Sequence, residues 1–155
     1  MKNKKFFSII VAAVAVIGLA AAGEKYEMLS IGSKAPKADV KMEDISGKKL
    51  SLTDIKKDKG LLVIFSCNTC PFVIAWEDRY PGLGELCAKN NIGMVLVNSN
   101  EARRDGVDSK TEMKKHAEEK NYNCSYVIDE KSEVANASGA KTTPHVYLFD
   151  KDMKL

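Results

Sequence analysis

The sequence predicts an α/β fold in which the strands of a sheet with parallel crossovers alternate with helices. Two continuous apolar runs, at residues 61–65 and 92–97, have the length of strands that are covered on both faces. Two further strand-like segments follow at residues 124–128 and 146–149, and segments with helical patterns separate the four. This alternation is typical of a sheet built with crossover connections. The 155 residues, of which 45% are hydrophobic and 29% charged, are enough for one such domain.

The amino-terminal segment predicts a secretory signal peptide at residues 1–22. A lysine-rich start precedes an apolar run that ends in three alanines, so cleavage is expected before Gly23. An uncleaved membrane anchor is the alternative, but the run from Phe6 to Ala22 is at the short end for a helix that spans a bilayer. We therefore expect an exported protein, periplasmic or extracellular, in a compartment where disulfides persist. Membrane contact is expected only if the leader is retained.

The charge balance of the mature part argues against one large class of partner. The formal net charge is +3, and three of the 24 Lys and Arg residues lie in the leader, which leaves 21 basic against 21 acidic residues. A nearly neutral domain lacks the basic face that a phosphate backbone requires, so no nucleic acid partner is expected. Residues 23–35 are predicted to be a tether, and residues 36–155 the folded domain.

The first part of the folded domain is expected to form a hairpin, a strand and a long helix. Ser46-Gly47-Lys48 separates two short segments within residues 40–52, which predicts a β-hairpin. After the strand at 61–65, a helix is expected from about Cys70. Its predicted apolar face consists of Phe72, Val73, Trp76, Leu83 and Leu86. Pro81 and the neighbouring glycines are expected to kink this helix, and Trp76 is expected to pack in the core beneath it.

The second part of the domain has clear helix boundaries. Ser109 and Glu112 form a capping-box pattern at the start of a charged helix that runs to about Lys120, and its charges are expected to be solvated. Ser132 is expected to cap a short helix that Gly139 ends.

The motif that carries chemistry is Cys67-Asn68-Thr69-Cys70, which joins a buried strand to a helix. Two intervening residues let both sulfurs meet within one helical turn, so an exchangeable disulfide can close. Cys67 is expected at the helix N-terminus, where free backbone N–H groups and the helix dipole stabilise a thiolate. Cys67 is therefore the candidate nucleophile, and Cys70 is the candidate resolving thiol.

Two alternatives compete with redox chemistry at this pair. A structural zinc half-site needs two further ligands, and the sequence contains no second C-x-x-C and no H-x3-H. A purely structural disulfide gives less stabilisation in so short a loop. We expect no metal and no organic cofactor. The other two cysteines, Cys87 and Cys124, either form a second disulfide or remain buried thiols.

Several motifs together resemble a known family. The C-x-x-C after an apolar strand and Thr143-Pro144 before the last strand are similar to the thioredoxin fold. The segments 31–36 and 46–52 resemble the entry to the redoxin branch, the alkyl hydroperoxide reductase/thiol-specific antioxidant (AhpC/TSA) superfamily. The run 67–79 is similar to a thioredoxin-like subgroup of that branch, which acts as exported thiol–disulfide oxidoreductases.

The resemblance implies a fold and further site residues. The fold would be a central mixed sheet flanked by helices, with an N-terminal hairpin extension and a βα insertion. The last seven residues suggest a strand, a turn and the start of another strand, so a C-terminal strand and helix are expected to be missing. Pro144 would be a cis-proline that faces the dithiol, and Thr143 would offer backbone groups to a substrate.

The sequence also differs from the patterns of two related groups, the peroxiredoxins and the thioredoxins. Peroxiredoxins carry P-x3-[ST]-x2-C around the cysteine that attacks peroxide, and neither Cys67 nor Cys70 has that pattern before it. Thioredoxins have a buried Asp six residues before the first cysteine, where this chain has Leu61. The proton relay for the resolving thiol must therefore come from elsewhere. Glu77 is the candidate for this relay. The alternative is that its carboxylate is solvated on the helix face.

The leading functional hypothesis is an exported thiol–disulfide oxidoreductase whose partners are protein thiols or disulfides and an upstream thiol reductant. The first alternative is a thiol-dependent peroxidase in the same fold. The second is a copper-handling protein, because soft thiolates favour Cu(I) and His145 follows Pro144. Asn68-Thr69 contains no cation to stabilise a thiolate, which favours a reductant over a strong oxidant.

Overall fold

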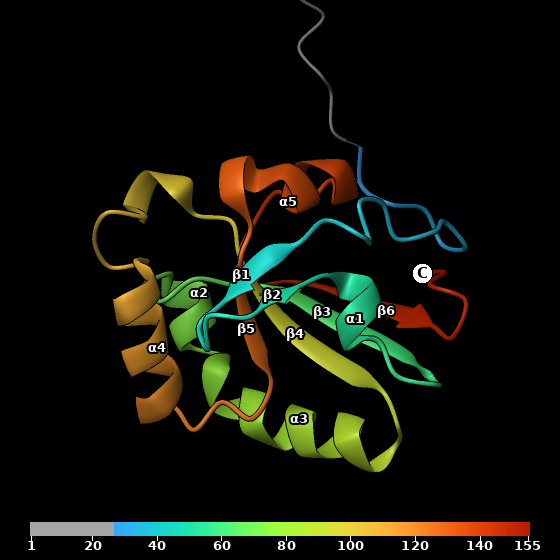
Figure 1. Ribbon diagram of the computed structural model, residues 1–155, viewed down its shortest axis with the longest axis horizontal. Helices are drawn as coiled ribbons and strands as arrows, with labels where there is room; N and C mark the ends of the chain where they lie inside the picture. Colours follow the sequence, from blue (N-terminus) through green and yellow to red (C-terminus); the bar gives the residue numbers. More distant parts are fainter. Residues whose placement is uncertain (1–26) are drawn as a thin grey trace, which may run out of the picture.

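The computed structural model describes residues 27–155 (Figure 1). The predicted signal peptide and the first residues of the predicted tether lie outside the described residues. Within the described part, no helix has the length and apolar character needed to cross a membrane.

The core of the fold is one mixed sheet of six strands in the order β2-β1-β5-β4-β3-β6. The strands are β1 (Met42–Asp44), β2 (Lys49–Leu50), β3 (Gly60–Phe65), β4 (Gly93–Asn98), β5 (Ser125–Ile128) and β6 (His145–Asp150). The central strands β3, β4 and β5 are parallel, as predicted, while β1, β2 and β6 run antiparallel to their neighbours. The predicted hairpin is confirmed, since Met42 pairs with Leu50 and Gly47 has φ +87° in the turn.

Helices cover both faces of the sheet (Figure 1). They are α1 (Leu52–Ile55), α2 (Pro71–Ile74), α3 (Tyr80–Lys89), α4 (Lys110–Glu119) and α5 (Glu133–Ser138), with 3-10 turns η1 (Glu77–Arg79), η2 (Glu101–Arg103) and η3 (Glu130–Ser132). On one face, α1 and α5 pack on alternate residues of β3, such as Val63 and Phe65. On the other face, α2, α3 and α4 pack on Leu62 and Ile64. This alternation is why β3 is buried along its whole length.

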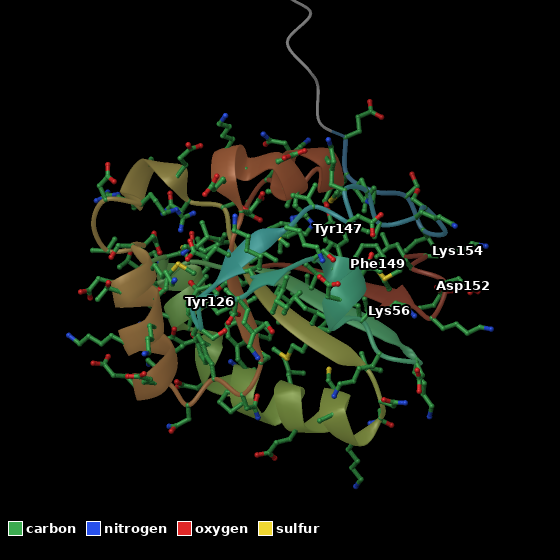
Figure 2. The ribbon with its side chains drawn as sticks, viewed as in Figure 1. Lys56, Tyr126, Tyr147, Phe149, Asp152 and Lys154 are labelled. Carbon is green, nitrogen blue, oxygen red and sulfur yellow. The ribbon has the colours of Figure 1, made fainter. Side chains whose placement is uncertain are left out.

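Tyr126 and Tyr147 are two large aromatic side chains, one in each half of the core. Tyr126 of β5 belongs to the half under α3 and α4, and Tyr147 of β6 belongs to the half under α5 (Figure 2). Both are almost fully buried, and each hydroxyl is hydrogen-bonded, Tyr147 to the carbonyl of Ser138 and Tyr126 to the side chain of Asn68. The second contact connects the core directly to the segment between the cysteines.

The prediction of a single kinked helix after Cys70 is wrong. The segment forms a short helix, α2, then the turn η1, and then α3, in which Pro81 stands in the first turn. Proline has no N–H to donate, so it favours the start of a helix over its interior. The interruption changes the helical phase, and Phe72, Trp76 and Leu86 are therefore exposed, while Val73 is buried.

The predicted cap of the short helix α5 is also wrong. Ser132 makes no cap hydrogen bond to the helix, and its hydroxyl donates to the carbonyl of Ser99 at 2.8 Å. The buried carboxylate of Asp129 accepts from the backbone N–H groups of Val134 and Ala135, each at 2.9 Å. The predicted end at Gly139 is confirmed, with φ +65°.

Candidate functional site

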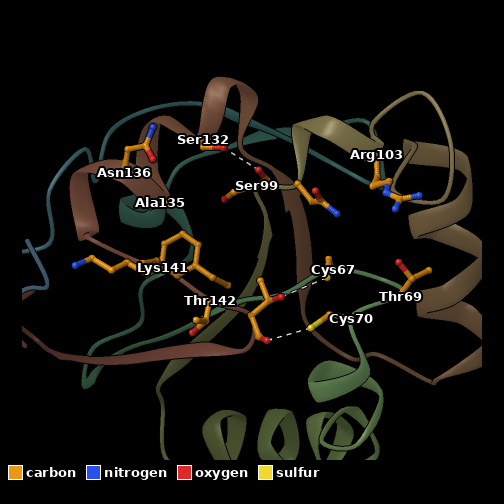
Figure 3. Close-up of a pocket in the computed structure, with 14 residues that line it drawn as sticks. Cys67, Thr69, Cys70, Ser99, Arg103, Ser132, Ala135, Asn136, Lys141 and Thr142 are labelled. Carbon is orange, nitrogen blue, oxygen red and sulfur yellow. Dashed lines mark hydrogen bonds between the residues drawn. The ribbon is translucent and has the colours of Figure 1, made fainter. Parts of the chain in front are cut away.

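The two cysteines lie at the carboxyl end of β3, between the strand and α2. The strand is held on both sides by β4 and β6, so its end is fixed where the polypeptide leaves the sheet. Cys67 is buried, with 5% of its surface exposed, and Cys70 is partly exposed. Both are free thiols, and both line a cleft of about 440 Å³ (Figure 3).

Thr143 contacts both cysteines from the segment that precedes β6. Its hydroxyl lies 3.4 Å from the Cys67 sulfur, and its carbonyl oxygen accepts from the Cys70 thiol at 3.2 Å (Figure 3). The peptide bond from Thr143 to Pro144 is cis, as the resemblance implied. The structure thus brings together Cys67, Cys70 and Thr143, while the substrate-binding role of Thr143 and Pro144 stays a prediction.

The expected position of Cys67 at a helix N-terminus is wrong. The helix begins at Pro71, and Cys70 is its N-cap residue. Burial raises the pKa of the Cys67 thiol above its ordinary value, with a smaller opposing contribution from the Thr143 hydroxyl. Burial also acts to raise the pKa of Cys70, but hydrogen bonds from Thr143 and from the backbone N–H groups of Val73 and Phe72 outweigh it, so this pKa is lowered. The thiolate-stabilising environment therefore belongs to Cys70.

The segment between the cysteines is held by a buried polar network. The backbone N–H of Asn68 donates to Asp108 Oδ1 at 2.9 Å, and the Asn68 side-chain amide donates to the carbonyl of Val107 at 2.7 Å. The Tyr126 hydroxyl donates to Asn68 Oδ1 at 2.9 Å. Asn68 is 6% exposed and Asp108 is fully buried. The residue next to Cys67 is therefore fixed by its backbone and by both ends of its side chain.

Glu77, the predicted proton relay, lies in a different cluster. Its carboxylate is 1% exposed, so the alternative of a solvated helix-face carboxylate is wrong. His116 Nε2 and Lys120 Nζ each lie 2.7 Å from a Glu77 oxygen, and the Tyr122 hydroxyl donates to it at 3.0 Å. Burial opposes ionisation, but these partners together lower the pKa of Glu77. The hydrogen bonds of this carboxylate join η1 to the end of α4, and none of them goes to Cys67 or Cys70.

A second, apolar cleft of about 680 Å³ lies on the other side of the segment that carries the cis-proline. It is lined by Phe72 and Trp76 from the interrupted helix and by Thr143, Pro144 and Val146 from the chain leading into β6. Trp76 was expected in the core; it is 54% exposed, and the Arg79 guanidinium lies 4.5 Å above its ring. Thr143, which contacts both cysteines, therefore lines both clefts.

The structure also places the other two cysteines and His145. Cys87 and Cys124 are both free thiols packed in the same half of the core, and burial raises the pKa of Cys124 to about 12. His145 begins β6 beside Phe65 and stacks on Tyr147 with ring centroids 4.7 Å apart. Within residues 27–155, no three His, Cys, Asp or Glu side chains gather in a way that could hold a metal ion.

Asp108, Asn98 and Asn100 are the site residues that the sequence analysis missed. The two asparagines end and follow β4, whose carboxyl end lies beside that of β3. Parallel neighbouring strands bring their carboxyl ends to the same edge of a sheet, so polar residues there were a usable signal. Asp108, in the loop before α4, offered none beyond its place next to the helix cap Ser109.

Comparison with known proteins agrees with this geometry. The AhpC/TSA family model matches residues 31–155. An uncharacterized conserved protein from Geobacillus kaustophilus is 36% identical, with a TM-score of 0.77; the match covers 83% of this chain and 67% of that one. No curated protein matches the sequence.

Two more distant structures show the fold alone. The thioredoxin domain of a thiol-disulfide oxidoreductase from Bacteroides vulgatus is 22% identical, with a TM-score of 0.67, over 81% of this chain and 85% of that one. A peroxidoxin from Mycobacterium tuberculosis is 17% identical, with a TM-score of 0.62, over 83% and 82%. The six-stranded mixed sheet with helices on both faces is therefore a thioredoxin-like fold, and the chain belongs to the AhpC/TSA family.

Proposed function

We propose that this protein is an exported thiol–disulfide oxidoreductase that uses Cys67 and Cys70 to reduce protein disulfides. The observation that carries the proposal is the contact of Thr143 with both sulfurs, its hydroxyl toward Cys67 and its carbonyl toward Cys70. A single residue of an adjacent segment thus faces both members of the pair, at the floor of an open cleft. Export rests on the signal-peptide pattern of residues 1–22.

The exchange proceeds in two balanced steps. Cys67 loses its proton, and its thiolate attacks one sulfur of the substrate disulfide. This forms a mixed disulfide and releases the other substrate sulfur as a thiolate that takes up a proton. Cys70 then loses its proton and attacks the Cys67 sulfur, which releases the second substrate thiolate and closes the Cys67–Cys70 disulfide. The upstream thiol reductant returns the two electrons.

The environment of Cys70 suits the second step. A lowered pKa favours the Cys70 thiolate that attacks in this step. The donors that achieve this are Thr143 and the backbone N–H groups of Phe72 and Val73. A proton relay through Glu77 is therefore not part of the proposed mechanism, since its hydrogen bonds go to His116, Lys120 and Tyr122.

Trapping of the mixed disulfide tests this proposal. Cys70→Ser should accumulate a covalent complex with a disulfide-containing protein such as insulin, and both Cys67→Ser and Cys70→Ser should lose catalytic insulin reduction. Cys87→Ser, which changes a buried thiol in the same core, is the matched control and should leave insulin reduction unchanged. A complex that forms with Cys67→Ser and not with Cys70→Ser would reverse the assigned order. No reduction by the wild type, combined with rapid peroxide-dependent oxidation of one cysteine, would replace the proposal with a peroxidase.

A further inference from the structure

We propose that Asp108 is a positioning residue that favours reduction of the substrate by the dithiol, by holding the loop after Cys67 with a buried carboxylate that forms no ion pair. The inference rests on the proposed dithiol function and specifies its direction. It comes from a network of hydrogen bonds that joins three segments distant in sequence: the loop between the cysteines, the end of β4, and the loop before α4.

The Asp108 carboxylate accepts from neutral donors only. Oδ1 accepts from the backbone N–H of Asn68 at 2.9 Å and from the side-chain amide of Asn98 at 2.8 Å. Oδ2 accepts from the side-chain amide of Asn100 at 2.7 Å. Every one of these partners is a donor, which is the arrangement that suits an ionised carboxylate.

No lysine, arginine or histidine within residues 27–155 forms an ion pair with this carboxylate. Arg104 is the nearest bonded cation, but its guanidinium donates to the backbone carbonyls of Asp108 and Asn98, at 2.9 and 2.8 Å. Because Asp108 is fully buried, solvent screens its charge little.

The position of this charge disfavours a thiolate on Cys67. The backbone N–H of Asn68, the residue next to Cys67, donates to this carboxylate, which holds the charge close to the dithiol loop. The negative charge itself also repels a second negative charge on Cys67, in addition to the larger effect of burial. The thiolate on Cys70 is stabilised separately by Thr143 and the start of α2.

The other ionisable groups around Cys67 do not cancel this repulsion. Tyr80 and Tyr126 pack near it, and burial raises the pKa of each, so both are neutral at physiological pH. Cys70 contributes a further negative charge when it is ionised. Arg103 lines the same cleft and is exposed, so its charge is screened by solvent.

A destabilised Cys67 thiolate has a defined redox consequence. A high-energy thiolate is a poor leaving group, so the mixed disulfide on Cys67 is resolved by Cys70 rather than lost by return of the substrate thiolate. Asp108 therefore favours electron flow from the dithiol to the substrate.

The test is Asp108→Asn, which keeps the shape of the side chain and removes its charge. In a Cys70→Ser background, iodoacetamide alkylation of Cys67 at pH 7, read by peptide mass spectrometry, should be at least tenfold faster with Asp108→Asn than with Asp108. In the same background, a thiol should release Cys67 from its mixed disulfide with glutathione about threefold faster with Asp108→Asn, because Cys67 is then a better leaving group. Asp108→Glu, which keeps the charge, should change the alkylation rate much less.

Two results would overturn the proposal. One is equal acceleration by Asp108→Asn and Asp108→Glu, which would show a purely structural role. The other is an unchanged Cys67 alkylation rate in a folded Asp108→Asn protein. Should Asp108→Asn not fold, Asn100→Lys places a cation beside Oδ2 and must shift the same two readouts in the same direction. Alkylation needs no substrate, so its result is independent of whether insulin reduction and trapping succeed.

Discussion

Glu77 and Asp108 are two fully buried carboxylates in the half of the molecule that carries the dithiol, and their bonding partners differ in charge. Glu77 lies against Lys120 and His116, whereas the Asp108 carboxylate bonds only to amide N–H groups. Both carboxylates have hydrogen-bonding partners at both oxygens, so they differ in the charge of those partners and not in hydrogen bonding. A paired charge stabilises the elements that it joins, while an unpaired one acts on the ionisable groups nearby.

The locations of the two carboxylates match these roles. Glu77 lies where the helix after the dithiol is interrupted, and its partners come from α4 and the residues that follow it. Tyr122, one of these partners, also packs against the rings of Tyr80 and Tyr126, with centroids 5.6 and 6.0 Å apart. The cluster therefore fixes the interruption between α2 and α3. The Asp108 carboxylate bonds to Asn68, Asn98 and Asn100, at the end of the sheet where the chemistry is proposed.

The largest effect on stability is expected from Glu77→Ala. It removes the buried acceptor that Lys120, His116 and Tyr122 share and leaves the space of its side chain empty, which should cost about 3 kcal/mol of unfolding free energy. Urea denaturation followed by circular dichroism measures this change. Asp78→Ala is the matched control, because Asp78 is the next residue but its side chain is 84% exposed. That control should cost less than about 0.5 kcal/mol. Equal losses in the two variants would show that the cluster contributes no specific stability.

A smaller, pH-dependent effect is expected from Glu77→Gln. This variant keeps the shape and should cost about 1.5–3 kcal/mol at pH 7, the value of hydrogen bonds to a charged group. The folded pKa of Glu77 is lowered, so its contribution is complete above the unfolded value of about 4.3 and is lost as the pH falls through the folded value. The difference in unfolding free energy between wild type and Glu77→Gln should therefore shrink below about pH 4. A difference that stays constant from pH 7 to pH 3 would contradict the assignment of charge to Glu77.

The sequence predicted the parts of this site that are local and missed those that depend on long-range contacts. The C-x-x-C pair after a buried strand and the cis bond before Pro144 follow from short motifs and from the resemblance, and the structure has both. Asp108 follows Asn68 by 40 positions in the chain, and no periodicity connects them. Only the packing of β3, β4 and the loop before α4 brings them together.

Glu77 shows a different limit of sequence reasoning. A continuous helix from Cys70 would place Trp76 towards the core and Glu77 towards solvent. The interruption at η1 reverses this, so Trp76 is exposed and Glu77 is buried. Pro81 predicted a disturbance of the helix, but not that a whole turn would separate two helices of different phase. Side-chain orientation near the dithiol therefore had to come from the structure.

The smallest effect on stability is expected from Lys120→Met, and this variant also tests whether Glu77 and Asp108 have different roles. Lys120→Met removes one cation from Glu77 and leaves His116 and Tyr122 in place, and Lys120 is itself 35% exposed. We expect a smaller loss of unfolding free energy by urea denaturation than Glu77→Gln gives, because the remaining partners still satisfy the carboxylate. If Glu77 acts on the fold and Asp108 on the dithiol, the same variant should shift the alkylation rate of Cys67 in the Cys70→Ser background less than twofold. A tenfold shift with Lys120→Met would mean that the Glu77 charge also reaches the cysteines, and the division between the two carboxylates would then fail.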